Sequence, residues 1–518
     1  MGKKKVLVIG AGPAGLAAGY RLLKEAGTDY DVTILEASNE IGGISKTVDY
    51  RGNRMDTGPH RFFTKDPGVL AFWHEIMPVQ GKPSYDDKLL GIQKNLATGG
   101  PDPEEEDRVM LLRDRITRIL YNGKFFDYPI SLKFDTLKNM GFTNTMIAGF
   151  SYLKSIIIKK KETNLENFFL NRFGRKLYSM FFEGYTAKLW GRHPKNIDAS
   201  WGAQRVKGVS ITAVVKNAFE KILKIKGQTE TSLIEYFYYP KYGSGFFYET
   251  VAKEIENMGG KILFGHEVNG INCQQDIITG VTCKKNYTVV TIEGDYVLSS
   301  MPVKDLVAAF YGNRKDKNIE RIAEGLPYRD YFTVGLLLKR LKLKNETPIK
   351  TVNNIIPDDW VYIHDSRVKM IRFVVFNNFS PYMVKNVNEE IMVALEYACG
   401  EKDDLWQKSD DELKKYAVNE FISMGIINED DVIDAHVERV KKAYPAYFDT
   451  YEEFDKIIDY LNKFTNLFCI GRNGQHRYNN MDHSILTGFV AADIITGKIK
   501  DKTSLWEVNT EKEYHEEK

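Results

Sequence analysis

The feature that most constrains the fold is a glycine-rich turn close to the start of the chain. A short apolar run, Lys5–Ile9, leads directly into Gly10-Ala11-Gly12-Pro13-Ala14-Gly15. The run has the length and β-branched composition of a buried parallel strand. In this motif the first glycine permits a tight turn, the second lets the backbone approach a pyrophosphate, and the third lets the helix pack on the strand. The sequence therefore predicts a Rossmann-like unit with the N-terminus of a helix facing phosphates.

A carboxylate stands where such a unit binds ribose. The second predicted strand, Asp31–Leu35, ends in Glu36, which follows Gly15 by 21 residues. At this position a carboxylate accepts hydrogen bonds from both ribose hydroxyls. Its negative charge would repel a 2′-phosphate, so we expect a cofactor without one.

A second glycine pair, Gly42-Gly43, follows the Glu36 strand at once. Glycines here suit close approach of the backbone to the remainder of a long, extended cofactor. We therefore expect FAD rather than NAD.

Bulk composition excludes several classes of protein. The chain has 518 residues, with 72 basic and 70 acidic side chains spread along it, so nothing indicates a nucleic-acid partner. The four cysteines form no CxxC or Cys/His cluster, and we expect no metal site. Lys3–Lys5 run straight into the first strand, which predicts no signal peptide and a cytoplasmic protein.

The remaining patterns predict an α/β protein whose FAD-binding domain is discontinuous in sequence. We assign residues 1–85, 230–310 and 440–518 to that domain, residues 86–229 to a mostly helical substrate domain, and residues 311–439 to a substrate domain with an antiparallel sheet over the flavin.

Two segments carry more specific expectations. Lys261–Val297 reads as a small meander with turns at Gly270, Gly280 and Gly294. Met146–Ile158 is the most apolar long stretch, but it is too short to span a bilayer. We expect a core or surface helix there with no transmembrane segment, and its basic continuation is either a solvated helix end or a contact with an anionic membrane.

Four segments, read in order, resemble UDP-galactopyranose mutases and, more broadly, protoporphyrinogen-oxidase-like members of the amine-oxidase superfamily. The segments are Gly58–Thr64, Gly184–Gly191, Leu326–Arg329 and Gly471–Asp482. The resemblance implies a flavoprotein that isomerises a nucleotide-linked sugar between pyranose and furanose rings without net redox, using reduced FAD, in surface polysaccharide biosynthesis. An FAD-dependent oxidase or dehydrogenase is the alternative, and a non-enzymatic flavoprotein is a third.

The resemblance also implies roles for individual residues. Arg329 and Arg205 would clamp the departing diphosphate, with Tyr328 beside them at the substrate. A structural ion pair is the other interpretation of Arg329. For Arg205, the spacing is one residue longer than in the mutases.

Three more residues are expected on the substrate side. Trp190 and Tyr185 would line the sugar pocket, although aromatic residues on an apolar helix also suit a core. Asp127 stands where the mutases have an asparagine, and a turn-forming aspartate is the other interpretation.

The C-terminal motif and one histidine complete the predicted site. Arg472 would lie near the isoalloxazine, Tyr478 would reach the substrate phosphate, and the backbone at Asn480 and Met481 would face the flavin carbonyls. His60 would lie at the reactive face of the flavin, where it hydrogen-bonds or moves a proton; a histidine satisfied by backbone groups is equally compatible.

Departures from the mutase pattern fall on the substrate side. Phe63 replaces a histidine, His476 replaces a tyrosine, Asn480 replaces an aspartate, and the tyrosine of a Tyr-Thr-Arg segment is missing near Met370–Arg372. These differences leave the prediction of FAD binding untouched and bear on the identity of the sugar and of the reaction.

Overall fold

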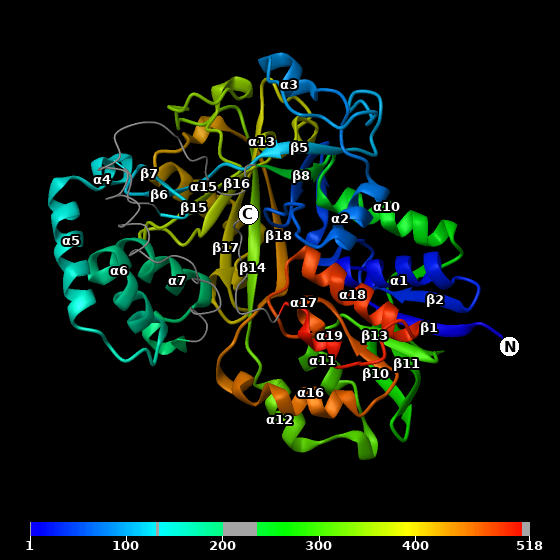
Figure 1. The fold of residues 1–518 in the computed structure, drawn as a ribbon. Coiled ribbons are helices and arrows are strands. Elements are labelled where there is room, and N and C mark those ends of the chain that lie inside the picture. The colour runs from blue at the N-terminus through cyan, green and yellow to red at the C-terminus, as the bar shows by residue number, and fades with distance from the viewer. Residues whose placement is uncertain (1, 131–133, 200–235, 510–518) are drawn as a thin grey trace.

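A five-stranded parallel sheet forms the dinucleotide-binding part of the molecule. The computed structural model describes residues 2–130, 134–199 and 236–509 (Figure 1). In spatial order the strands are β19 (Leu467–Cys469), β13 (Tyr296–Ser299), β1 (Lys4–Ile9), β2 (Tyr30–Leu35) and β9 (Lys261–Leu263). Three distant parts of the chain thus build one sheet. The predicted α/β class, with a dinucleotide fold assembled from separate segments, is confirmed; the exact domain boundaries stay a prediction.

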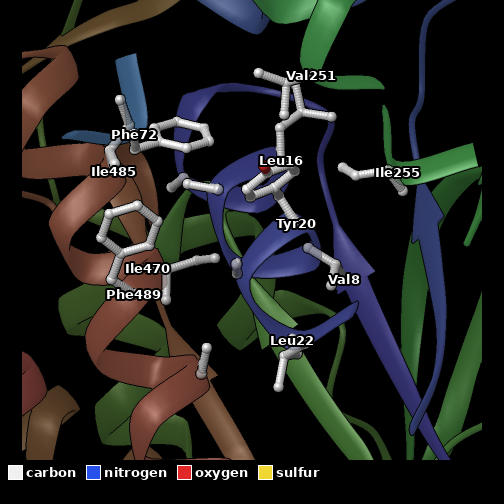
Figure 2. Packing of buried hydrophobic residues seen from close by; sticks show 14 of the residues in the cluster. Val8, Leu16, Tyr20, Leu22, Phe72, Val251, Ile255, Ile470, Ile485 and Phe489 are labelled. Atoms are coloured by element: carbon white, nitrogen blue, oxygen red, sulfur yellow. The ribbon is translucent and has the colours of Figure 1, made fainter. Parts of the chain in front are cut away.

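Helices cover this sheet because its strands are apolar and buried. The side chains of β1 from Val6 to Ile9 are buried. The helices α1 (Pro13–Ala26), α10 (Ser244–Asn257) and α18 (Met481–Ile495) are amphipathic or apolar elements of the same core. Figure 2 shows Leu16 and Tyr20 of α1 packed among side chains from these helices. The cofactor end of α1 is therefore held in a rigid position.

The predicted meander is present, but two of its turns lie elsewhere. The strands β10 (Glu267–Gln274), β11 (Ile277–Lys285) and β12 (Thr288–Glu293) form an antiparallel sheet. Its turns contain Gln275 and Asn286, both with positive φ. Gly270 and Gly280 lie inside strands instead. A Cβ on Gly280 would come within 2.3 Å of the Ile292 carbonyl, so the lack of a side chain serves packing there rather than turning.

A seven-stranded sheet forms the second half of the molecule. Its order is β18 (Val432–Pro445), β14 (Tyr328–Leu338), β17 (Ile391–Cys399), β16 (Arg372–Val375), β15 (Trp360–Ile363), β6 (Thr117–Tyr121) and β7 (Lys124–Asp127). All pairs are antiparallel except β15 with β6, which is parallel. The predicted antiparallel sheet is thus a mixed one, because the β6–β7 hairpin from the segment predicted as mostly helical completes its edge.

A helical layer lies beyond the β7 edge of this sheet. It contains α4 (Phe134–Met140), α5 (Phe142–Ile157), α6 (Leu165–Phe181) and α7 (Glu183–Trp190). In Figure 1, α5 lies at the left edge of the molecule, at the opposite side from β1 and β2. α6 and α7 share one aromatic core with β18. The predicted helical segment is therefore helical from residue 134 to residue 190, but strands precede it.

The remaining helices and strands connect these layers. They are β3 (Thr47–Tyr50), β4 (Asn53–Asp56), α2 (Pro67–Ile76), α3 (Tyr85–Leu90), β5 (Met110–Asp114), β8 (Tyr236–Pro240), α11 (Val303–Ala308), α12 (Lys317–Glu324), α13 (Phe376–Phe379), α14 (Asp404–Gln407), α15 (Asp410–Ser423), α16 (Phe454–Asn462), α17 (Gly471–Gly474) and α19 (Ser504–Glu507).

Candidate active site

The turn between β1 and α1 is built so closely that only glycine fits. Gly10 has φ +99°, and a Cβ on it would lie 2.2 Å from Ser300 Oγ. A Cβ on Gly15 would lie 2.0 Å from the Gly10 carbonyl oxygen. Gly12 is different, because a Cβ there would meet nothing closer than 3.9 Å. Gly10 and Gly15 are thus required by the protein itself, whereas Gly12 leaves open space at the N-terminus of α1.

Glu36 lies at the end of β2, beside this turn. Its Oε2 accepts a hydrogen bond from the Ala11 backbone N–H at 2.8 Å, and its Oε1 accepts from the N–H and Oγ of Ser38 at 2.9 and 2.8 Å. These bonds fix the orientation of the carboxylate. These bonds use both lone pairs of Oε1 and one of Oε2, so Oε2 can still accept a hydrogen bond from a ribose hydroxyl.

The second glycine pair closes on the first turn. Gly42 and Gly43 have φ of +102° and +55°, and a Cβ on Gly43 would lie 3.3 Å from the Cα of Gly12. Two backbone segments without side chains thus face each other at the N-terminus of α1. This cradle, with a carboxylate at its side, fits the pyrophosphate and ribose of FAD.

The C-terminal motif adds a second helix N-terminus. Gly471, with φ +73°, follows β19, and a Cβ on it would lie 3.0 Å from the Cβ of Ala14. Arg472 donates to the Asn479 carbonyl at 2.8 Å and to the Ala443 carbonyl at 3.1 Å, which orders the loop before α18. Asn480 precedes the first residue of α18. The N-terminal N–H groups of α18 therefore suit acceptor oxygens of a ligand.

A cavity of about 1050 Å³ joins these segments to the seven-stranded sheet. This volume is at the upper end of the range for small-molecule sites and suits a large ligand or two adjoining ligands. The predicted site residues that border it are Gly10, Gly12, Pro13, Ala14, Glu36, Gly43, His60, Arg472, Tyr478, Asn480 and Met481. Gly15 and Gly42 adjoin these residues in the chain.

Two guanidinium groups flank one tyrosine in this cavity. Arg372 Nη2 lies 3.3 Å from Tyr444 Oη, and Arg472 lies 5.8 Å from the centre of the Tyr444 ring. The Tyr478 ring stacks on Tyr444 at 5.6 Å with an interplanar angle of 13°, and Arg472 lies 4.6 Å from the centre of the Tyr478 ring. All four residues border the cavity. The cluster offers positive charge and flat aromatic surface together.

Arg372 is held by a buried acid. Its Nε donates to Glu396 Oε2 at 2.6 Å, and the two residues are direct cross-strand partners on β16 and β17. The Glu396 side chain is 1% exposed. Burial opposes the charge on Arg372, but Glu396 outweighs it and holds the pKa of the guanidinium well above its ordinary value. The cation is thus fixed in position and charge.

His60 is oriented by a second buried acid. Its Nδ1 lies 3.4 Å from Ser244 Oγ and 3.7 Å from Asp56 Oδ2. Asp56 is fully buried and accepts from Thr47 Oγ1 at 2.5 Å, Tyr239 Oη at 2.8 Å and the Ser244 N–H at 3.1 Å. Burial, reinforced by the adjacent Asp56 carboxylate, raises the pKa of Tyr239 well above its ordinary value, so the phenol stays a donor. The imidazole therefore borders the cavity with an anchored carboxylate behind it.

Arg329, expected at the diphosphate, and Tyr328, expected at the substrate, are not among the residues that border the cavity. Arg329 donates from Nε to the Leu189 carbonyl at 3.3 Å, and its Nη1 lies 3.6 Å from Asp403. It therefore closes the C-terminal end of α7. The Tyr328 ring packs edge-on against His476 at 4.7 Å, and burial raises the pKa of Tyr328 above its ordinary value.

The aromatic residues of α7 also lie behind the cavity wall. Tyr185 stacks on His364 at 4.7 Å and contacts the edge of Tyr362, which itself borders the cavity. Trp190 is 3% exposed in the helical core, edge-on to Phe448. Both positions agree with the alternative that these aromatic side chains of α7 belong to a hydrophobic core.

One of the last two predicted residues, Asp127, is not among the residues that border the cavity. Asp127 ends β7 opposite Arg118, next to Tyr128, which does border the cavity. Arg205 lies outside the described residues. Their predicted roles stay predictions.

Four residues at the site were missed by the sequence prediction: Asp56, Arg372, Glu396 and Tyr444. Arg372 and Glu396 carried a readable signal, because a charge in a short apolar strand is costly unless it is paired. Asp56 carried no such signal, since it ends the polar strand Asn53–Asp56. Tyr444 carried none, since tyrosine is common in strands.

Comparisons with known proteins place this architecture in a family. The family model described as flavin containing amine oxidoreductase matches residues 13–496. A probable UDP-galactopyranose mutase from Klebsiella pneumoniae is 28% identical over 211 residues, which are 39% of this chain and 44% of that protein. A coproporphyrinogen III oxidase from Staphylococcus aureus (strain NCTC 8325 / PS 47) is 23% identical over 300 residues, 55% of this chain and 57% of that protein. The chain thus spans about half the length of these relatives.

Solved structures agree with the same fold. A reduced UDP-galactopyranose mutase superposes with a TM-score of 0.74 at 20% identity, covering 98% of this chain and 99% of that one. A protein described as a putative protoporphyrinogen oxidase from Exiguobacterium sp. 255-15 gives 0.64 at 15% identity, covering 96% and 100%. The resemblance predicted from the four motifs is confirmed. The family model covers nearly the whole chain, and the glycine cradle with the Glu36 carboxylate beside it fits the cofactor, so this protein belongs to the flavin containing amine oxidoreductase family and is an FAD-dependent enzyme.

Proposed function

We propose that this enzyme isomerises a nucleotide-linked sugar between its pyranose and furanose forms, without net redox, for surface polysaccharide synthesis. The observation that carries the proposal is the Arg372–Tyr444–Arg472–Tyr478 cluster, which borders the same cavity as the glycine cradle. Guanidinium groups pair with diphosphate oxygens, and tyrosine rings pack against a sugar or a base. A nucleotide sugar offers both kinds of group.

The protein's own residues would hold FAD across the cavity. The backbone of Gly12 and Gly43 would approach the pyrophosphate, Glu36 would accept from the ribose, and the N-terminus of α18 would donate to the ring carbonyls. When bound, the flavin supplies the nucleophilic centre of a mutase or the electron acceptor of an oxidase. All other contributions to the reaction come from the protein, which binds and orients the substrate and transfers its protons.

His60 is the candidate for proton handling. Its Nδ1 faces the anchored Asp56 carboxylate, which favours one tautomer and one ring orientation. An imidazole held at this place on the cavity is the side chain that would accept the proton of a substrate hydroxyl.

Arg329 and Arg205 remain candidates for the leaving diphosphate. Arg329 would have to exchange its contact with Asp403, half of whose side chain is exposed, for the phosphate.

The test is a titration of flavin-loaded protein with UDP, GDP and dTDP, followed by flavin absorbance in the oxidised and the anaerobically reduced states. We expect one nucleotide to perturb the flavin more strongly in the reduced state and the response to be lost in Arg329→Ala. Arg192→Ala is the matched control, since Arg192 pairs with Asp449 at 2.7 Å on the surface. Absence of any response in either state contradicts the proposal.

Oxidation of a substrate is the second candidate function. It is favoured by the match to a coproporphyrinogen III oxidase over 55% of this chain, and arginines accept carboxylates as well as phosphates. The two functions separate by stoichiometry: an oxidase consumes one electron acceptor per turnover, whereas the isomerase consumes none.

A further inference from the structure

The helix α5 turns its apolar side away from the protein. Phe142 is 82% exposed, Phe150 66%, Leu153 56% and Ile157 81%. Their spacing of three, four and eight residues places them on one face of the helix. A surface helix of a globular protein usually shows the reverse arrangement.

The opposite face of α5, which contacts the protein, carries small and polar residues together with Tyr152, which packs partly buried against the aromatic core. Ser151 Oγ accepts a hydrogen bond from the Lys176 N–H at 3.0 Å, and a Cβ on Gly174 of α6 would lie within 2.8 Å of the Ser151 backbone. Ala148 is the one buried apolar side chain of α5. Packing on α6 therefore uses close backbone approach, and the exposed apolar side chains of α5 contribute little to it.

The exposed apolar side chains gather in this one segment. Among the described residues, nine of the nineteen exposed large hydrophobic side chains lie between residues 137 and 158. The nine are Leu137, Phe142, Met146, Ile147, Phe150, Leu153, Ile156, Ile157 and Ile158. A contiguous patch of this kind marks an interaction surface.

The charges within this segment are all positive, and one acid flanks it on each side, Asp135 and Glu162. Residues 136–161 contain Lys138, Lys154 and Lys159–Lys161 and no Asp or Glu. The first acid beyond them, Glu162, is paired with Arg172 at 2.7 Å. An isologous contact between two copies would bring these lysines together, which disfavours a second copy of the chain as the occupant.

No helix in the described parts of the chain has both the length and the apolar character needed to cross a bilayer. α5 forms the edge of the molecule farthest from β1 in Figure 1, where a flat surface can reach it. We propose that α5 binds the surface of an anionic phospholipid bilayer, with its apolar face in the headgroup boundary and its lysines at the lipid phosphates. This inference is independent of which reaction the enzyme performs.

The experiment is co-sedimentation of the flavin-loaded full chain with vesicles of phosphatidylcholine alone or mixed with phosphatidylglycerol. We expect binding to the mixed vesicles that weakens with added salt. Phe150→Glu with Ile157→Glu should reduce the partition coefficient by about tenfold or more. Tyr287→Glu with Val289→Glu is the matched control, because these residues are 102% and 69% exposed at the β11–β12 turn.

A separate variant tests how much the lysines contribute to vesicle binding. Lys154→Gln, Lys160→Gln and Lys161→Gln together should lower binding by about fivefold for each lysine at low salt. Lys159 is left in place because its Nζ donates to the Asn171 carbonyl at 2.8 Å. Flavin content and melting temperature show that each variant is folded.

Three outcomes would overturn the inference. The wild type does not sediment with the mixed vesicles at low salt; the α5 variant binds as well as the wild type; or the α5 variant loses a concentration-dependent dimer while the wild type ignores vesicles, which assigns the patch to self-association.

Discussion

The two ends of the cavity are built in different ways. The cofactor end consists of backbone, in which Gly10, Gly12 and Gly43 bring chain segments into contact. The substrate end consists of charged and aromatic side chains, such as Arg372 and Tyr444, which project from strands remote in sequence. The first is specified by short-range sequence, the second by tertiary contacts.

This difference predicts different responses to mutation. The cofactor end should respond to added volume, since close approach is its function. The substrate end should respond to lost charge, since a buried acid such as Glu396 needs its cation.

Breaking the Arg372–Glu396 pair should have the largest effect. We expect Arg372→Gln to lower the free energy of unfolding by about 3–5 kcal/mol, because Glu396 would remain buried without its partner. Arg372→Gln with Glu396→Gln should recover most of that loss, as measured by urea unfolding. If the single and double variants were equally unstable, the unpaired Glu396 carboxylate would not be the cause of the lost stability.

Added volume at Gly12 should remove the cofactor and keep the fold. We expect Gly12→Val to weaken FAD binding by about 100-fold, or roughly 3 kcal/mol, because the new side chain meets only backbone at 3.9 Å and beyond and would fill the approach to the pyrophosphate. Flavin retained per protein on dilution measures this. Gly149→Ala, which meets nothing within 4 Å, is the matched control. If Gly12→Val retained as much flavin as the wild type, the Gly12 backbone would not lie close to the pyrophosphate.

His476, which is buried against Tyr328 and the Ala446 carbonyl, should make stability depend on pH. Burial lowers its pKa from 6.5 to about 4, so the unfolded chain binds a proton more readily than the folded one. The contribution of His476 to the free energy of unfolding is fully present above pH 6.5. It is lost as the pH drops to about 4, which lowers the free energy of unfolding by roughly 3 kcal/mol. Unfolding measured across this range should show a smaller slope in His476→Phe. If the free energy of unfolding changed with pH equally in the variant and the wild type, His476 would not be the source of this pH dependence.

The smallest effect on stability is expected from a substitution at Tyr239, which donates to the Asp56 carboxylate near His60. Tyr239→Phe removes one of the donors to Asp56 and should cost about 1 kcal/mol in thermal unfolding, since Thr47 and the Ser244 N–H still donate to the carboxylate. A loss above about 3 kcal/mol would mean that Asp56 depends on Tyr239 alone.

The sequence predicted the parts of the site that depend on neighbouring residues. The strand, turn and helix around Gly10–Gly15 were readable because the spacing of the glycines after an apolar strand is a short-range pattern in the sequence. The α/β class followed from the same patterns. The positions of Trp190 and Arg329 were not readable, because a helix face or a strand end does not show which neighbour it meets.

By itself, the sequence determined the cofactor end, the family and the flavin, since backbone geometry is encoded within a few residues. Only the tertiary structure decided that Arg372 and Arg472 flank Tyr444, that Arg329 closes α7, and that α5 faces outward. The physical reason is that the side-chain direction of a residue depends on the register of its strand or the rotation of its helix, and both are set by packing against distant segments.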